Sequence, residues 1–492
     1  MNMKYILTID AGTTSVRALL FDAKKNTIAR VEKLHFKQYF PKPAWVEHDA
    51  DEIWKKVVEC IKKVCKGVPA NEIYGIGITN QRETVVCWDK LSGEPLYHAI
   101  VWQCRRTAKE CEKLKNSSMA SVIKQKTGLL PDAYFSATKV KWLLDNVPQI
   151  QKASREHRLC VGTIESFLVF KLTEGRSFVS DVTNASRTML YNIHTMDWDE
   201  ELIEFFDVPR EALPKVVPND KIVGNTTLLG GEIPIAGLIG DQQSSLFGQG
   251  CFEKGMAKNT FGTGCFMLFN TGKEALESKC GLLTTVGYKI KGKMCYALEG
   301  SVFNSGSTVD WAIDNLNIAK TPQELTTLAT SIEDNDGVYL VPAFTGLGTP
   351  YWDMDARASI TGITRGTDKR HIARSVLESM AYSCYDVLNC MEQETGIKIK
   401  ELHIDGGGSV NQFLMQFVCD LVQTKIVQSA TESTCMGAIF MTGLATGVYE
   451  TLGQIKKLLP SQQSFLPKRN FEEMKPLIEQ WHNAVKKTIN KC

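Results

Sequence analysis

The chain has 492 residues, with 57 Lys and Arg against 55 Asp and Glu, for a formal net charge of +2. At roughly 100–250 residues per domain, this length predicts two large domains or several small ones. The balanced charge argues against a polyelectrolyte ligand, so we do not expect a nucleic-acid partner. Hydrophobic residues make up 43% and charged residues 23%, which are usual proportions for a folded globular chain.

Cysteine usage and apolar runs bear on the compartment and on membranes. The 15 Cys residues form no Cys-x-x-Cys pair, so we expect free thiols in a reducing environment. The apolar run at residues 5–9 is too short for the core of a secretory signal, and we expect a cytoplasmic protein. The longest uncharged stretch, residues 433–449, falls short of the ~20 residues that cross a bilayer. It predicts a buried helix rich in small residues, and we expect no membrane span.

The chain opens on a hairpin pattern that returns halfway along. Residues 5–10 and 16–21 are apolar runs on either side of a polar Gly/Thr turn, as in a β-hairpin. Residues 259–269 repeat this plan of strand, Gly/Thr turn and strand, about 250 residues later. Two halves built on one plan predict a cleft between them, which is a favoured place for a ligand.

Helical spacing is clear in two further segments. From Asp51, apolar residues recur at helical spacing as far as Gly67, where we expect the helix to end. Residues 369–396 form a second amphipathic pattern, and residues 73–79 read as a β-branched strand. Because strand, loop and helix alternate along the chain, the fold class is α/β.

Several common catalytic motifs are missing from the sequence. It contains no G-x-x-x-x-G-K-[ST], G-x-G-x-x-G, H-E-x-x-H or G-x-S-x-G pattern. A P-loop ATPase, a Rossmann dehydrogenase, a zinc protease of this type and an α/β-hydrolase are therefore not expected.

Three Gly-rich turns follow predicted strands. Asp10 precedes Gly12-Thr13-Thr14, a turn whose N–H groups and hydroxyls can face phosphate oxygens while the carboxylate holds a phosphate-bound Mg²⁺. Similar turns occur at residues 262–264 and 406–408, the latter before a helix predicted from Asn411. A nucleotide held from several sides is one interpretation. An ordinary hairpin with a solvated Asp is the other.

A second set of residues suits a small polyol. Arg82 only donates and an ionised Glu83 only accepts, so this pair can hydrogen-bond neighbouring hydroxyls, although such a dipeptide is more often a surface ion pair. Trp102 and Phe266 are candidate apolar walls, or simply core residues. Asp241 ends an apolar run, the usual position of a catalytic carboxylate in an α/β fold.

Taken together, these motifs resemble the FGGY family of carbohydrate kinases. Residues 134–145 and 358–378 fit the two family signatures, and residues 77–84, 99–103, 240–243 and 405–407 resemble its glycerol-phosphorylating branch. The resemblance implies an α/β fold of two actin/hexokinase-like (ribonuclease H-like) domains flanking an active-site cleft. It places polyol binding and the first phosphate turn in residues 1–248, and nucleotide binding with a C-terminal helical tail in residues 249–492.

The resemblance also implies an activity and a set of residues. The expected reaction is ATP-dependent phosphorylation of glycerol to sn-glycerol 3-phosphate, the first step of glycerol degradation, with Mg²⁺ as cofactor. Asp241 matches the general base and Asp10 the residue that organises the metal. The positions matching glycerol contacts are Arg82, Glu83, Trp102, Tyr134, Asp241, Gln242 and Phe266. The positions expected to contact ATP are Thr13, Thr14, Ser15, Arg17, Thr263, Gly306, Asp310, Gly407 and Asn411. Since the family commonly forms dimers and tetramers, we expect a homodimer or homotetramer.

The sequence departs from the family pattern in places. Ala11 flanks the phosphate turn where Gln is usual, and Asp310 stands where Gln is often found near the adenine, which leaves the preferred nucleotide base open. Glu232 stands where an Arg can serve sugar-bisphosphate inhibition, so this inhibition is not expected. Two other interpretations remain: a kinase for a related polyol or sugar, and an ATP-binding regulator that transfers nothing.

Overall fold

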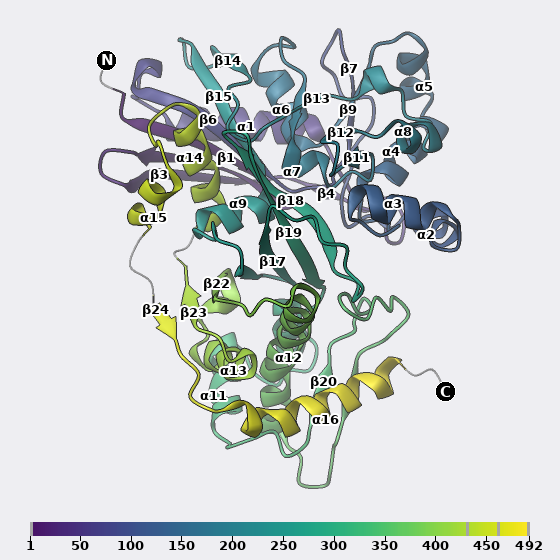
Figure 1. Ribbon diagram of the computed structural model, residues 1–492, viewed down its shortest axis with the longest axis vertical. Coiled ribbons are helices and arrows are strands. Elements are labelled where there is room, and N and C mark those ends of the chain that lie inside the picture. Colours follow the sequence, from purple (N-terminus) through teal and green to yellow (C-terminus); the bar gives the residue numbers. More distant parts are fainter. Residues whose placement is uncertain (1–2, 430–431, 460–462, 490–492) are drawn as a thin grey trace.

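Two mixed β-sheets organise the chain in the computed structural model, which describes residues 3–429, 432–459 and 463–489 (Figure 1). The first sheet has the strand order β14 (Gly224–Thr226), β15 (Ile233–Gly240), β6 (Ile73–Asn80), β1 (Tyr5–Ala11), β2 (Ser15–Asp22), β3 (Thr27–His35). The second has the order β18 (Leu283–Ile290), β19 (Lys293–Val302), β17 (Cys265–Gly272), β16 (Met256–Phe261), β22 (Glu401–Asp405), β23 (Ile426–Gln428), β24 (Gln463–Phe465).

The two sheets share one topology around their central hairpins. Strand β1 is antiparallel to β2 and parallel to β6, and β6 is in turn parallel to β15. In the same way β16 is antiparallel to β17 and parallel to β22, and β22 is parallel to β23. The repeated hairpin pattern predicted for the two halves is therefore confirmed, and the fold is a two-domain α/β architecture.

Helices and short strands fill the space around these sheets. The remaining strands form small ladders: β4 (Gln38–Tyr39) with β5 (Glu47–His48) and β8 (Ala99–Ile100), β7 (Val86–Asp89) with β9 (Leu159–Gly162), β10 (Val179–Asp181) with β13 (Lys215–Val217), β11 (Tyr191–Asn192) with β12 (Asp197–Trp198), and β20 (Tyr339–Val341) with β21 (Ser359–Thr361). The α-helices are α1 (Ala50–Val64), α2 (Ala108–Lys115), α3 (Met119–Thr127), α4 (Ser136–Asn146), α5 (Pro148–Arg155), α6 (Ile164–Leu172), α7 (Val182–Ala185), α8 (Glu200–Phe205), α9 (Asp241–Gly248), α10 (Gly306–Asp314), α11 (Pro322–Thr330), α12 (Lys369–Thr395), α13 (Gln412–Val422), α14 (Ser433–Ala445), α15 (Leu452–Leu458) and α16 (Phe471–Ile489). Three short 3₁₀ turns are η1 (Ala70–Glu72), η2 (Arg210–Ala212) and η3 (Gly407–Val410).

The two amphipathic helices form where their sequence patterns predict them. Helix α12 ends at Thr395, and Gly396 follows in the left-handed conformation with φ 64°, which terminates the helix. Helix α1 begins after Asp49, whose carboxylate accepts hydrogen bonds from the first-turn N–H groups. It ends at Val64, slightly before the predicted end at Gly67. The hydrophobic spacing thus identified both helices, and only one terminus differs.

Helix α14 packs tightly against helix α9 beneath the first sheet. A Cβ on Gly437 would lie 1.9 Å from the Ser244 carbonyl oxygen, and one on Gly248 would lie 2.0 Å from that of Ser433. Only glycine permits such a close approach of two helices. The buried small-residue helix predicted within residues 433–449 is confirmed. Figure 1 also places α14 and α15 beside the first sheet, although both come late in the sequence.

The sequence predictions about membrane-spanning helices and free thiols can be compared with the residues that the structure describes. Among them, no helix combines the length and the apolar character that a bilayer crossing demands. All 14 cysteines in the described part of the chain are free thiols, as expected, and Cys492 lies outside it.

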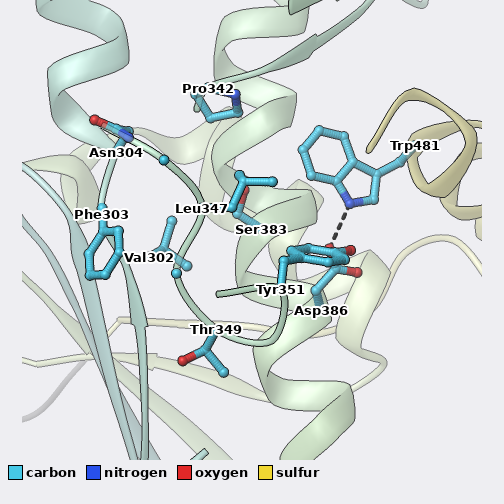
Figure 2. Close-up of a pocket in the computed structure, with 12 residues that line it drawn as sticks. Val302, Phe303, Asn304, Pro342, Leu347, Thr349, Tyr351, Ser383, Asp386 and Trp481 are labelled. Carbon is cyan, nitrogen blue, oxygen red and sulfur yellow. Dashed lines mark hydrogen bonds between the residues drawn. The ribbon is translucent and has the colours of Figure 1, made fainter. Parts of the chain in front are cut away.

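The C-terminal helix α16 is anchored on α12 through one buried carboxylate. Asp386 accepts hydrogen bonds from Tyr351 Oη at 2.7 Å, Trp481 Nε1 at 2.8 Å and His482 Nε2 at 2.8 Å. Figure 2 shows the first two side chains converging on Asp386 beside a cavity of about 20 Å³, which is water-sized. Two of these donors, Trp481 and His482, belong to α16, so one acid fixes the helical tail to α12.

Candidate active site

The loop after β6 carries a buried pair, not a surface ion pair. Arg82 and Glu83 are only 2% and 1% exposed, and Glu83 has the left-handed φ of 60°. Arg82 Nη1 and Nη2 donate to the two oxygens of Glu299 at 2.6 and 2.9 Å. Its Nε lies 3.4 Å from Asp241 Oδ1. Non-glycine residues in this backbone region are often held there at functional sites, which agrees with a functional role for this buried loop.

Asp241 is the first residue of α9, directly after β15. Because β15 and β6 are parallel neighbours, their carboxyl ends bring Asp241 and the Arg82 loop to the same sheet edge. The backbone N–H of Gln242 donates to Asp241 Oδ1 at 2.7 Å. Burial raises the pKa of Asp241 above its usual range, while the charges of Arg82 and Lys258 oppose that shift. A carboxylate with a raised pKa beside a donor is suited to accept a proton.

Lys258, on β16, is a fully buried cation next to Asp241 and Gln242. Its ammonium donates to the Gln242 side-chain oxygen and to Thr260 Oγ1, the latter at 3.0 Å. Burial lowers the pKa of Lys258 to about 8, although Asp405 and Asp241 favour its charged form. Lys258 therefore orients Gln242 from the second sheet.

Three aromatic rings line the space beside Arg82. The Trp102 ring centroid lies 5.6 Å from that of Tyr134 and 6.1 Å from that of Phe266, both in edge-on arrangements. Tyr134 Oη accepts a long hydrogen bond, 3.4 Å, from Arg82 Nη2. Since Phe266 comes from β17 and Trp102 from the first half of the chain, both halves contribute to this wall.

The turn predicted to bind phosphate after β1 contacts this wall directly. Trp102 Nε1 donates to Thr13 Oγ1 at 3.0 Å, and the turn itself is closed by Gly12 N donating to Ser15 O at 3.0 Å. Arg17, opposite Asp10 in the β1–β2 ladder, forms an ion pair with Glu432 just before α14. Trp102, predicted to face the polyol, and Thr13, predicted to face phosphate, are therefore in direct contact.

Asp10 has an environment that favours a cation. Burial, and then the negative charges of Asp241 and Glu432, raise the pKa of Asp10 to about 7 despite the opposing charge of Arg17. The described residues contain no group of three or more His, Cys, Asp or Glu that could hold a metal by themselves. Mg²⁺ typically takes one or two carboxylates, phosphate oxygens and waters, so Asp10 fits an ion that binds with the nucleotide phosphates.

A cavity of about 640 Å³ in the second half contains every nucleotide position predicted there. It is lined by Thr263, Gly306, Asp310, Gly407 and Asn411, together with apolar side chains of α12 and α13. This volume is in the usual range for small-molecule sites.

The glycines of this cavity allow its turns to touch. A Cβ on Gly306 would lie 2.6 Å from the Gly262 carbonyl oxygen, and Gly406, with φ 86°, would bring a Cβ to 2.4 Å from the Phe261 oxygen. Asn411 caps α13 through Leu414 N at 3.0 Å, as the predicted helix start requires. The turn-to-turn packing leaves the pocket open above Gly407, where a Cβ would meet nothing within 4 Å.

The predicted ATP positions on the first hairpin are not among the described residues that line this cavity. None of its described lining residues comes from the β1–β2 hairpin, which carries Thr13, Thr14, Ser15 and Arg17. Ser15 lies at the start of β2 and not in the turn. The structure thus brings the predicted polyol set into contact with the predicted phosphate turn at Thr13, and the five remaining nucleotide positions line the 640 Å³ cavity.

Sequence reasoning missed several charged residues of the site. These are Arg187, Lys258, Glu299 and Glu432, of which the first three are fully buried. The available signal was a charge beside apolar residues in a predicted strand: Glu299 follows the run Tyr296-Ala-Leu298, and Lys258 follows Met256-Ala257. Such charges are almost never fully buried unless paired, which makes the pattern informative.

Comparisons with known proteins agree with this architecture. Residues 5–248 match the N-terminal domain, and residues 257–446 the C-terminal domain, of the FGGY family of carbohydrate kinases. The chain is 49% identical to "Glycerol kinase 2" of Thermotoga maritima over 99% of both chains. It is 47% identical to "Glycerol kinase" of Shewanella halifaxensis, over 99% of this chain and 100% of that one.

Solved structures give the same result. The chain is similar to the Plasmodium falciparum glycerol kinase crystallised with ADP, with a TM-score of 0.94, 37% identity, and coverage of 100% of this chain and 99% of that one. It shares its fold with a xylulose kinase of Lactobacillus acidophilus, with a TM-score of 0.88 and 23% identity over 98% of each chain. With both family domains matched in order and relatives covering nearly its whole length, the chain belongs to the FGGY family of carbohydrate kinases.

Proposed function

We propose that this protein transfers the γ-phosphoryl group of ATP to a terminal hydroxyl of glycerol, giving sn-glycerol 3-phosphate. The observation that carries the proposal is the position of Asp241, whose carboxylate lies 3.4 Å from Arg82 Nε at the edge of an aromatic wall. The names of close relatives and the ADP-bound structure of a similar protein support the choice of glycerol and ATP.

The polar and apolar groups suit a short triol. Arg82 supplies donors and Glu83 an acceptor, so adjacent hydroxyls can donate to one and accept from the other. The rings of Trp102, Tyr134 and Phe266 provide an apolar surface for the carbon chain. A longer sugar presents more hydroxyls to these rings without polar partners, which is costly once they are desolvated.

The chemistry requires a base and a neutralised phosphate. An alcohol is a weak nucleophile at neutral pH, so Asp241 takes the hydroxyl proton as the bond to phosphorus forms. Asp10 holds Mg²⁺, which when bound offsets charge on the nucleotide phosphates. The turn N–H groups after β1 and β16 supply fixed donors to phosphate oxygens. The adenosine part occupies the 640 Å³ cavity lined by Asp310 and Asn411.

A coupled assay of ADP release tests the proposal. ADP release should depend on glycerol and on Mg²⁺, and the product should be oxidised by a dehydrogenase specific for sn-glycerol 3-phosphate. Erythritol, xylulose and dihydroxyacetone complete the substrate panel, since the fold is also similar to that of a xylulose kinase. Faster turnover of one of these compounds would assign another polyol. ATP binding without transfer to any of them would identify a regulator.

The predicted assembly and location are tested separately. Light scattering on the purified chain measures whether it is the expected homodimer or homotetramer. Fractionation of cells that express it measures whether it is cytoplasmic. Both stay predictions from the family resemblance.

A further inference from the structure

A cluster of four buried charges lies behind the proposed polyol site. We call Arg82, Glu83, Arg187 and Glu299 the ion cluster. Glu299, on β19, is completely buried and accepts from Arg82 Nη1 at 2.6 Å, Arg82 Nη2 at 2.9 Å and Arg187 Nη2 at 2.8 Å. Although burial opposes its ionisation, the charges of Arg187 and Arg82 hold the pKa of Glu299 at about 2. Glu299 is therefore an anion with three charge-assisted hydrogen bonds, which are the stronger kind.

Arg187 extends the cluster to the second polyol residue. Its Nε donates to Glu83 Oε1 at 2.7 Å, while its guanidinium lies 5.2 Å from the ring centroid of Phe135. Glu83 needs this support because its backbone has the left-handed φ of 60°. Ser136 Oγ fixes the same residue by donating to its carbonyl oxygen at 3.1 Å. The Arg187 guanidinium thus bridges the carboxylates of Glu83 and Glu299.

These contacts occupy only some of the polar atoms of the Arg82 and Glu83 side chains. Arg82 donates from both Nη atoms to Glu299 and from Nη1 also to Gln243 Oε1 at 3.0 Å, and its Nε lies 3.4 Å from Asp241 Oδ1. Glu83 gives Oε1 to Arg187 and keeps Oε2 for another donor. Two cations and two anions leave the ion cluster formally neutral, so Asp241 is the additional negative charge at its edge.

We propose that Glu299 and Arg187 are positioning residues that set the orientation of Arg82 and Glu83, and thereby the affinity of the enzyme for its polyol. This inference rests on the proposed function, because it concerns the glycerol-binding side of that site. Neither residue is expected to touch the substrate. Both act through Arg82 and Glu83. Glu299 belongs to the second sheet, and Arg187 belongs to the segment after α7.

The first test is Glu299→Gln, which keeps the shape but removes the charge and turns an amide toward Arg82. Weaker charge-assisted hydrogen bonds should leave Arg82 less firmly oriented, so the KM for glycerol should rise ~10- to 100-fold. The KM for ATP should change less than about twofold, because Glu299 does not line the nucleotide cavity. Calorimetric titration of the variant with glycerol alone should show the same loss of affinity.

The matched control is Asp386→Asn. Asp386 is also a buried carboxylate with three donors, but these donors are Tyr351, Trp481 and His482, and it anchors the C-terminal helix instead of Arg82 or Glu83. This variant should melt at a lower temperature and keep the wild-type KM for glycerol. A KM increase in both variants would assign the effect to general loss of stability and overturn the inference.

A double variant separates orientation from charge. Glu299→Gln with Arg187→Gln restores a neutral cluster but removes the carboxylate that holds Arg82 and the guanidinium that holds Glu83, so the glycerol KM should stay high. Recovery of the wild-type KM in the double variant would mean that only charge balance matters, and the positioning role would be rejected.

Two outcomes keep the inference distinct from the proposed function. If the wild type neither binds nor phosphorylates glycerol, the proposed function fails. If the wild type is active and folded Glu299→Gln binds glycerol within twofold of it, only the inference fails. Should Glu299→Gln not fold, Arg187→Lys decides instead, since one ammonium cannot reproduce the bridge from Glu83 to Glu299. A wild-type glycerol KM in that variant would equally overturn the inference.

Discussion

Replacing Asp241 by Asn isolates the chemical step from binding. Asn has nearly the same shape, and its Oδ1 can still accept from the Gln242 N–H and face Arg82 Nε at 3.4 Å. What it loses is the capacity to take a proton. General-base assistance is worth about 10²–10⁴ in rate, or ~2.7–5.5 kcal/mol of barrier, so kcat should fall by that factor. Asp241 does not line the nucleotide cavity, and ATP affinity should therefore be kept.

The assay is steady-state ADP release, with a single-turnover measurement to separate transfer from product release. Calorimetry with ATP, and separately with glycerol, reports whether either site has been disturbed. Asp386→Asn serves again as control, because it removes a buried carboxylate whose donor Trp481 belongs to the C-terminal helix and not to the proposed site. A kcat for Asp241→Asn within threefold of the wild type would remove Asp241 from the role of base, since loss of general-base assistance should cost at least about 10² in rate.

Three further predictions follow from single contacts. Gly306→Ala places a methyl group 2.6 Å from the Gly262 carbonyl oxygen, so the turns must separate and the KM for ATP should rise about tenfold, with little change for glycerol; an unchanged KM for ATP would show that the turn yields freely. Phe266→Ala removes one ring of the polyol wall and should weaken glycerol binding by about tenfold in calorimetry, and equal affinity would mean that the ring does not contact substrate. The hydrogen bond to Asp386 raises the pKa of His482 above its ordinary 6.5, so protonation stabilises the fold at low pH, and this contribution is lost as pH rises through the folded-state pKa. The melting temperature of His482→Gln should therefore fall further below the wild type at pH 5.5 than at pH 8.5, and a pH-independent difference would contradict this.

Much of the fold could be predicted from the sequence because its signals are local. The helix at residues 369–396 was identified almost to the residue, since apolar spacing defines its buried face and Gly396 provides a left-handed end. The two hairpins could be recognised as copies because each carries a Gly/Thr turn between apolar strands. The candidate site was partly accessible for the same reason: Asp10 and Asp241 lie at or near the ends of apolar runs, where strands meet the sheet edge.

The exposure and partners of the charged residues were decided by tertiary structure alone. Arg82 and Glu83 read as a surface pair along the chain, yet they are buried because Glu299, 217 positions away, and Arg187 neutralise them. The physical reason is that a charge is stable in the interior only when paired, and the pairing residue is chosen by how the sheets pack and not by neighbours in sequence. Local pattern thus determined where the strands, turns and carboxylates stand, whereas packing of the β18–β19 hairpin against the first half determined which charges face one another.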